Sequence, residues 1–399
     1  MINGGEWYQN QARRNTLARQ HAFQPPSPIR IMRRTNGKSW TNMSYLWCES
    51  ADALGEWATR LPAGIPLYLD TEFMRERTYY PRLALVQVHD GETIRLIDTT
   101  RVPAAALAPA LAGRVLVMHA CSEDLEALAT FTGAYPARVE DTQIAAALVG
   151  ADMQTSYQRL IEERLGVSLP KGATRTDWLK RPLSDEQLRY AVDDVKYLIE
   201  LADGLRDQLR RLERLSWWHE ECERLRDDAR RRAEPGDAWR QVKGASALHG
   251  RELAVLEALA KWREARARER DLPKSFLVRD NVLLALSQAT QPSLDTLHEV
   301  GLHAKAIRRD GETLLALIEE AREAPPPSPL PGPLQPAQRQ QVKALRECVA
   351  GIAEQLNLKP DVLVRRRWLE ALVRDPSRLP EPLTGWRHDL VARPLLERL

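Results

Sequence analysis

The sequence PLYLDTEF, residues 66–73, decides the fold of this chain. Its apolar run has the period of a β-strand and follows a proline, so we predict a buried strand over 67–73. Successive side chains of a strand point to opposite faces, which places the carboxylates of Asp70 and Glu72 on one face. Two neighbouring anions repel each other and favour a cation, and carboxylate oxygens suit Mg²⁺ or Mn²⁺. Alone, however, a D-x-E pair is common and also fits an exposed strand end.

The segments around this strand predict a mixed sheet flanked by helices. Apolar runs predict further strands over 83–88, 93–97 and 115–118, and Asp90-Gly91 is a hairpin turn signal between the first two. Helical spacing is found over 123–132, 155–165 and 184–215, whereas no strand pattern is evident from 216 onward. The fold class is therefore α/β, followed by an all-α region.

Two more acids and a tyrosine are candidates for catalysis or metal binding. Asp124 follows the strand over 115–118 and opens a helix. An acid in a first helical turn also suits the helix dipole, and Ser122 as the N-cap would explain this neighbourhood without chemistry. Tyr190 and Asp194 are four residues apart in a helix, so they share one face. A half-buried tyrosine beside a solvated acid is the alternative for this pair.

Together these elements resemble the DEDD exonuclease superfamily, tyrosine subclass, and within it the ribonuclease D family. The resemblance covers about 44–399 and is carried by four stretches: LDTEF at 69–73, HACSEDLE at 119–126, RTDW at 175–178 and YAVDDV at 190–195. It implies a ribonuclease-H-like fold and a 3′→5′ exoribonuclease that releases 5′-mononucleotides. It also implies two divalent metal ions, Mg²⁺ or Mn²⁺, and RNA with a free 3′ end as substrate, tRNA precursors above all.

The resemblance assigns a role to each of the five key positions. Asp70 would bridge both ions, Glu72 and Asp194 would complete the site of the ion that binds the attacking water, and Asp124 would hold the second ion. Tyr190 would orient that water. We accordingly predict Asp70, Glu72, Asp124 and Asp194 as metal ligands and, with Tyr190, as catalytic residues.

Three further residues are candidates for substrate binding. Phe73 could stack on a terminal base, but it fits equally well as a core residue on the opposite strand face. His119 could touch substrate or be a structural residue at a strand end. Arg175 could meet phosphates together with Lys171 and Lys180, or the three could form a solvated surface run.

The helical half resembles HRDC domains, which are auxiliary nucleic-acid-binding modules. We predict an exonuclease domain over 43–215, a connecting segment over 216–243, an HRDC domain over 244–324, a Pro-rich linker over 325–333 and a second HRDC-like domain over 334–399. The most basic spot of the last domain is Arg365-Arg366-Arg367-Trp368.

Charge and cysteine content add little that is specific. The net charge is +3, but residues 1–42 contain seven basic residues and one acid, which leaves −3 for 43–399. We predict that residues 1–42 are disordered. Three explanations for this segment remain open: a start assigned too early, with Met43 as the true first residue, a flexible basic arm, or a transit peptide. The four cysteines are scattered and no apolar run of 18 residues exists, so we expect a cytoplasmic protein without a membrane span. The family resemblance implies a monomer.

Three rival functions remain to be weighed. A DNA exonuclease of the same superfamily would use the same acids, and nothing in these residues separates RNA from DNA. A non-catalytic nucleic-acid-binding protein would be expected to have lost some of the five key positions, all of which are filled. A P-loop ATPase is rejected, because Gly37-Lys38-Ser39 lacks the glycine that the pattern requires at position 32, where Met stands.

Overall fold

The computed structural model describes residues 45–170, 176–233 and 238–399. Residues 43–399 form one compact unit. The prediction of disorder for 1–42 and the candidate residues Lys171 and Arg175 lie outside the described residues. No helix in the described part of the chain is both long enough and apolar enough to cross a membrane.

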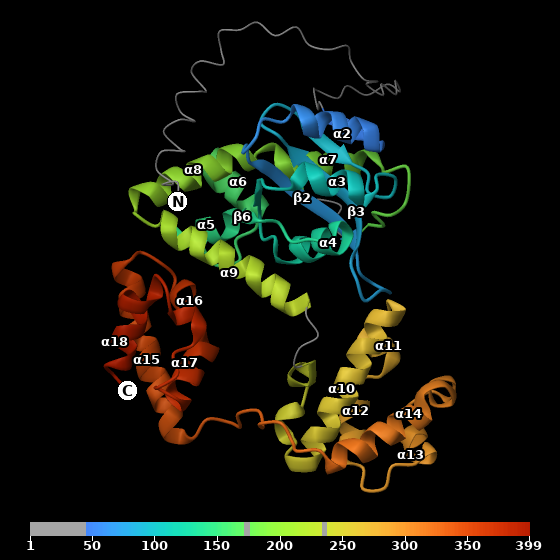
Figure 1. Ribbon diagram of the computed structural model, residues 1–399. Helices are drawn as coiled ribbons and strands as arrows, with labels where there is room; N and C mark the ends of the chain where they lie inside the picture. Colours follow the sequence, from blue (N-terminus) through green and yellow to red (C-terminus); the bar gives the residue numbers. More distant parts are fainter. Residues whose placement is uncertain (1–44, 171–175, 234–237) are drawn as a thin grey trace, which may run out of the picture. The chain divides into compact units, whose positions relative to one another are not determined.

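A six-stranded mixed sheet forms the centre of the N-terminal half, in the order β1-β4-β3-β2-β5-β6 (Figure 1). Strands β2, β3 and β4 are antiparallel neighbours, whereas β1 with β4, β2 with β5, and β5 with β6 are parallel pairs. The fold class predicted from the sequence is confirmed. The strands are β1 (Tyr45–Cys48), β2 (Leu67–Met74), β3 (Arg82–His89), β4 (Ile94–Ile97), β5 (Val115–Met118) and β6 (Arg138–Asp141).

Helices cover both faces of this sheet because its side chains are apolar on both sides. Leu69 of β2 and Met118 of β5 belong to one core, which the helices over residues 51–60, 104–111 and 122–132 complete. Tyr68 and Val117 belong to the core on the opposite face. The helices are α2 (Ala51–Arg60), α3 (Ala104–Leu111), α4 (Ser122–Thr132), α5 (Thr142–Leu148), α6 (Tyr157–Leu165), α7 (Asp185–Lys196), α8 (Leu198–Arg211) and α9 (Leu215–Ala233).

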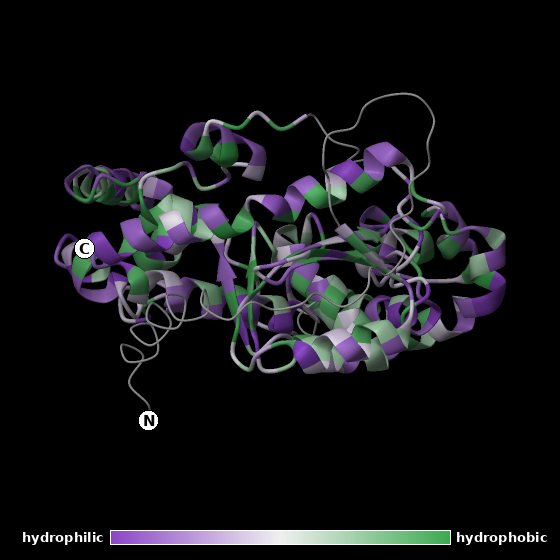
Figure 2. Ribbon diagram, turned by 90° about the horizontal axis from the view of Figure 1, so that it is seen from above, coloured by the Kyte–Doolittle hydropathy of each residue, from purple (hydrophilic) through white to green (hydrophobic). Residues whose placement is uncertain are grey.

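The rest of the described chain is helical and has two cores. One lies within α10–α14, and the other is shared by α15–α18 with α5, α6, α8 and α9. Figure 2 shows that the helices of the described chain carry both hydrophobic and hydrophilic residues. The helices are α10 (Gly250–Arg270), α11 (Lys274–Leu277), α12 (Asp280–Gln288), α13 (Leu294–Glu299), α14 (Ala304–Glu323), α15 (Pro336–Gln355), α16 (Pro360–Leu363), α17 (Arg366–Arg374) and α18 (Arg393–Leu396).

The C-terminal helices are fixed to α9 by a buried charge network. Arg387 is 3% exposed and forms an ion pair with Glu221 of α9, and it also donates to the carbonyl oxygens of Val362 and Leu363. The rings of Trp217 and Trp386 stack beside this pair, with centroids 4.3 Å apart. Because α9 also packs on β6, the C-terminal helices share a core with the sheet.

Candidate active site

The carboxylates of Asp70 and Glu72 lie where β2 extends beyond its parallel neighbour. Strand β5 pairs with β2 only at Leu67 and Tyr68, so β2 is open on that side from Leu69 onward. The two acids lie on the same face of β2 as Tyr68, and a β-bulge follows between Glu72 and Phe73. Both side chains are partly exposed. The arrangement of these two acids on one strand face therefore agrees with the period-2 pattern.

Helices α4 and α7 bring the remaining predicted residues to this place. Asp124 lies in the first turn of α4, which begins just after the carboxyl end of β5. Tyr190 and Asp194 lie on α7, which packs over β2, β3 and β4. A capping box of Ser184 and Gln187 starts α7, and the Trp178 ring lies 6.1 Å from that of Tyr190. All five residues predicted as catalytic thus belong to elements that meet at one end of β2.

The four carboxylates are close enough to perturb one another strongly. Burial raises the pKa of Glu72 to about 9, and the charges of Asp70 and Asp124 contribute to the increase. Burial likewise raises the pKa of Asp124 to about 6. The pKa values of Asp70 and Asp194 are also raised, first by burial and then by charge: Asp194 and Asp124 act on Asp70, and Glu72, Asp193 and Asp124 act on Asp194. Such mutual repulsion is what a bound cation relieves.

This donor set fits divalent metal ions, although no closed metal cage is preformed. Within the described ranges, no group of three or more His, Cys, Asp or Glu side chains converges into a ready metal site. Two features nevertheless fit a cation: all four side chains offer hard oxygen donors, and Asp194 Oδ2 is buried without a hydrogen-bond partner. Four anions without counter-charge keep apart, so we expect a cation to draw them together.

Asp124 is held by groups that the sequence did not reveal. The hydroxyl of Thr71 donates to Asp124 Oδ1. The helix begins at Ser122 with Cys121 as its N-cap, so the expectation that Ser122 caps this helix was wrong. Ser122 Oγ instead accepts a hydrogen bond from Arg232. No cap by Ser122 therefore explains the neighbourhood of Asp124.

A fifth acid, Asp141, organises the loop in front of Asp124. Its carboxylate is 2% exposed and accepts hydrogen bonds from the backbone N–H groups of Ala120 and Cys121, at 3.2 and 2.9 Å. It also caps α5 through Gln143 and Ile144. Ala120 adopts a left-handed conformation with φ of 55°, which these bonds compensate. An acid directly before an apolar helical segment was a signal that could have indicated this cap.

Of the three predicted substrate-binding residues, the structure describes His119 and Phe73. Both ring nitrogens of His119 are engaged, Nδ1 with Thr142 Oγ1 at 2.9 Å and Nε2 with the Thr155 carbonyl oxygen at 3.1 Å. Phe73 packs partly buried against the core around Leu69, with some of its surface exposed. Arg175 lies outside the described residues. Substrate contact by these three residues stays a prediction.

Two hollows flank the site. A depression of about 150 Å³ includes Tyr190 and Asp194, together with Gln158, Leu169 and Pro170. A larger cavity of about 1120 Å³ is lined by Ala120 and Ser122, which precede Asp124 in the sequence, but by none of the five catalytic candidates. We therefore regard the larger cavity as an approach to the site and the smaller depression as part of it.

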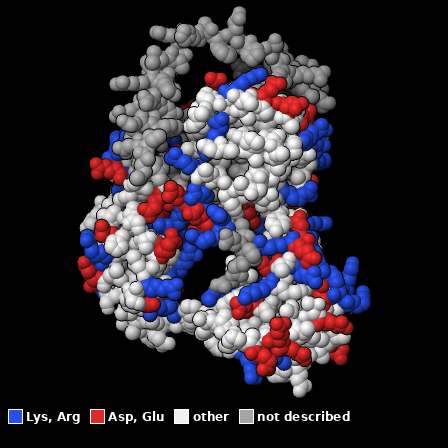
Figure 3. Space-filling model, viewed as in Figure 1, with Lys and Arg blue, Asp and Glu red and all other residues white. Residues whose placement is uncertain are grey.

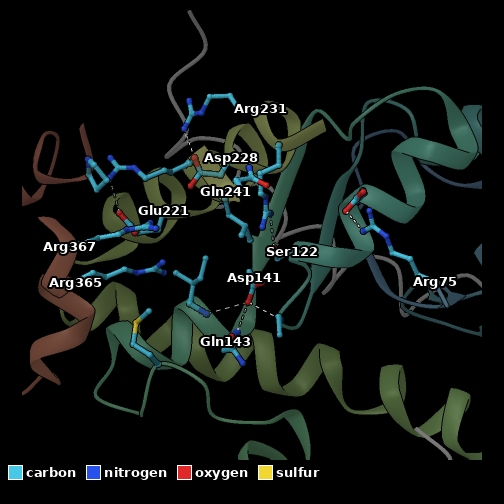
Figure 4. A pocket seen from close by; sticks show the side chains of 18 of the residues that line it. Arg75, Ser122, Asp141, Gln143, Glu221, Asp228, Arg231, Gln241, Arg365 and Arg367 are labelled. Carbon is cyan, nitrogen blue, oxygen red and sulfur yellow. Dashed lines mark hydrogen bonds and ion pairs between the residues drawn. The ribbon is translucent and has the colours of Figure 1, made fainter. Parts of the chain in front are cut away.

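The larger cavity has a strongly charged lining. Figure 4 shows Arg365 extending from the C-terminal helices toward the wall with Asp141 and Gln143. In Figure 3, basic and acidic side chains both border the hollow. Many of the cations are paired, such as Arg75 with Glu126 and Arg231 with Asp228. For Arg365 and Arg367, no carboxylate partner is found among the residues that the structure describes.

Comparison with known proteins identifies the family to which this chain belongs. A 3′-5′ exonuclease family model matches residues 45–210, and an HRDC domain model matches residues 252–318. Ribonuclease D of Pseudomonas paraeruginosa is 39% identical over 348 residues, which cover 84% of this chain and 92% of that protein. The chain belongs to the ribonuclease D family. Ribonuclease D of Escherichia coli is 36% identical over 88% of this chain and 98% of that protein.

Solved structures agree with the family assignment. The crystal structure of Escherichia coli RNase D, described as an exoribonuclease involved in structured RNA processing, matches with a TM-score of 0.83 and 36% identity. The match covers 90% of this chain and 99% of that one. As a member of the ribonuclease D family, the chain is a 3′→5′ exoribonuclease, a hydrolase, and the resemblance found in its sequence is confirmed.

Proposed function

We propose that this ribonuclease D family member removes 5′-mononucleotides one at a time from the 3′ end of RNA, using divalent metal ions held by Asp70, Glu72, Asp124 and Asp194. The single observation that carries this proposal is the convergence of four mutually repelling carboxylates with Tyr190 at one end of β2. When bound, two divalent ions supply activation of the attacking water and neutralise charge on the phosphate and the leaving 3′-oxygen.

The protein's own groups would position the reactants. As the family resemblance implies, Asp70 would contact both ions; the charges of Asp194 and Asp124 both raise its pKa. Burial and the surrounding carboxylates raise the pKa of Tyr190, so its phenol stays protonated in the metal-free site. A protonated phenol can orient a water molecule by hydrogen bonding, which makes orientation its role here.

The larger cavity supports a path for the RNA strand toward the site. RNA is a polyanion, and single strands are bound through basic grooves together with aromatic side chains. Arg365, Arg367 and Trp368 provide this combination at the cavity wall. We propose that the strand upstream of the scissile bond passes these residues. This would explain why helices far from the chemistry accompany the exonuclease domain.

The biological substrate and setting are further proposals. We propose 3′ extensions of tRNA precursors as the substrate, on the strength of the family resemblance. All four cysteines are free thiols, which supports the cytoplasm as the site of action. We also propose that the chain acts as a monomer, which light scattering coupled to size-exclusion chromatography would test.

The decisive experiment follows the degradation of a 5′-labelled RNA with an unpaired 3′ tail. We expect a ladder that shortens from the 3′ end in Mg²⁺ or Mn²⁺, disappears in EDTA and is absent for Asp70→Asn. Matched DNA run in parallel tests the rival DNA exonuclease, which would degrade DNA at least as fast. Binding of RNA without cleavage in any divalent metal would leave only the non-catalytic alternative.

A further inference from the structure

Gln87 is buried beside the catalytic carboxylates with no partner for its amide. It is fully buried, at 0% exposure, in the middle of β3. Neither Gln87 Nε2 nor Gln87 Oε1 forms a hydrogen bond. An unpaired buried amide is destabilising, so such groups require an explanation. Leu85, Val86 and Val88 around it are apolar and provide no partner, and His89 Nδ1 accepts a hydrogen bond from Gly91 instead.

The register of the sheet shows where this amide lies. Gln87 pairs directly with Asp70 across the antiparallel ladder of β2 and β3. Directly opposed residues of an antiparallel pair have their side chains on the same face, with Cβ atoms about 4.5–5.5 Å apart. Gln87 and Asp70 therefore share the face that α7 covers. Leu85, which pairs with Glu72, lies in the core that Ala191 and Val195 of α7 complete.

The same layer also contains an acceptor without a donor. Asp194 of α7 has a buried Oδ2 atom without a hydrogen bond, and its charge strongly influences Asp70. The side-chain amide of glutamine has two N–H donors, and carboxylates accept hydrogen bonds. The unused donors of Gln87 and the unused acceptor of Asp194 are thus complementary. Asp70, which pairs with Gln87 in the ladder, is a second carboxylate on the same face.

We propose that Gln87 is a positioning residue, whose Nε2 amide steadies the Asp70–Asp194 carboxylate pair when the active site is loaded. This inference rests on the proposed function of these two acids as metal ligands. Groups that hydrogen-bond to metal ligands fix the orientation of those ligands, and their loss lowers metal affinity or activity by roughly 10- to 100-fold. The amide is neutral, so it stabilises the two anions without competing with a cation for them.

The test compares Gln87→Met with the wild-type chain in three measurements. Methionine has a similar shape without the amide, so removing an unpaired polar group leaves the melting temperature unchanged or raises it. We expect kcat on a short RNA to fall by about tenfold, with KM unchanged, and Mn²⁺ affinity to weaken by a similar factor. Gln87→Asn, which keeps a shorter amide, should retain more activity than Gln87→Met.

A matched control removes another buried, unpaired polar atom. Thr99 Oγ1 is buried without a partner, and Thr99→Val should stabilise the protein without any change in kcat or Mn²⁺ affinity. Unchanged kcat and Mn²⁺ affinity in Gln87→Met would overturn the proposal. A marked loss of stability in Gln87→Met would overturn it too, because the amide would then be bonded within the core. An inactive wild-type chain would refute the proposed function, while the Mn²⁺ titration would still test Gln87.

Discussion

The Thr71 hydroxyl donates a hydrogen bond to Asp124 Oδ1 across 53 residues of sequence, and Thr71 itself stands between Asp70 and Glu72. Asp70 and Glu72 lie on one face of β2, and the Thr71 side chain between them hydrogen-bonds to Asp124 of α4. A single tripeptide of β2 thus contributes to the position of three of the four carboxylates.

This bond predicts the effect of Thr71→Val. The variant keeps the side-chain shape but removes the donor, so Asp124 loses a charge-assisted bond of about 1.5–3 kcal/mol. We expect kcat and Mn²⁺ affinity to fall by roughly tenfold or more, as for other groups that orient metal ligands. Thr71→Ser keeps the hydroxyl and should behave like the wild type. Equal activity of the Val and Ser variants would contradict this prediction.

The raised pKa values predict how pH acts on the metal-free protein. Unfolded Asp and Glu titrate near 4, whereas the folded pKa is about 6 for Asp124 and about 9 for Glu72. Between these limits the folded state retains protons that the unfolded state has lost. Stability of the metal-free protein should therefore decrease as pH rises from about 4 toward 9.

Added metal should remove this pH effect, because cations bind the deprotonated acids. We expect Mg²⁺ or Mn²⁺ to raise the melting temperature more at pH 8 than at pH 6, as measured by calorimetry. Metal-free Asp70→Asn should be more stable than the wild type at pH 8, since one buried charge is absent. A metal effect that is the same at both pH values would contradict the account of the site as four repelling acids.

Tyr190→Phe should reduce catalysis without loss of metal. The variant removes only the hydroxyl, so we expect kcat to fall roughly 100-fold through misplacement of the attacking water, with Mn²⁺ affinity unchanged. Because the pKa of Tyr190 is raised, the shape of the pH–rate profile should be the same in both proteins. Tyr45→Phe, at the edge of the same core, serves as the control and should be fully active. A Tyr190→Phe variant that loses the alkaline limb of the profile would instead identify Tyr190 as a base.

The buried ion pair between Arg387 and Glu221 predicts that the stability of the C-terminal helices depends on their contact with α9. Removal of one partner from a buried ion pair typically costs about 3–5 kcal/mol, so Arg387→Met should strongly destabilise the C-terminal helices. Urea unfolding and hydrogen exchange in α16 and α17 would measure this loss. Arg366→Met breaks only an exposed pair with Glu370 and should have little effect. Equal effects of the two variants would contradict the prediction.

We expect the arginines that line the larger cavity to affect the hydrolysis of long RNA but not that of short substrates. Arg365→Gln combined with Arg367→Gln should raise KM for a long RNA and flatten its salt dependence, because two phosphate contacts are lost. Hydrolysis of a dinucleotide, whose internucleotide phosphate is itself the scissile one, should be unchanged. Arg366→Gln is the matched control, since Arg366 is already paired with Glu370. An equal loss on both substrates would mean that these arginines do not guide the strand.

Some elements were predicted from the sequence, and others were missed. Strands β2, β3, β4 and β5 and helices α4, α6, α7 and α8 lie where apolar periodicity placed them. Strands β1 and β6 were not predicted, although they have four residues each, as β4 and β5 do. β6 also contains the buried acids Glu140 and Asp141, which resemble a loop when considered without their partners.

The sequence by itself determined which residues pair locally, because a period of two joins Asp70 with Glu72 and a helical turn joins Tyr190 with Asp194; that they carry the chemistry stays a prediction. These relationships are local, so backbone geometry alone fixes them. Only the tertiary structure decided how the pairs are supported: Thr71 bonded to Asp124, Asp141 bonded to the loop before it, and Gln87 placed opposite Asp70. Such contacts depend on strand register and on the closure of loops tens of residues long, and no local pattern encodes either.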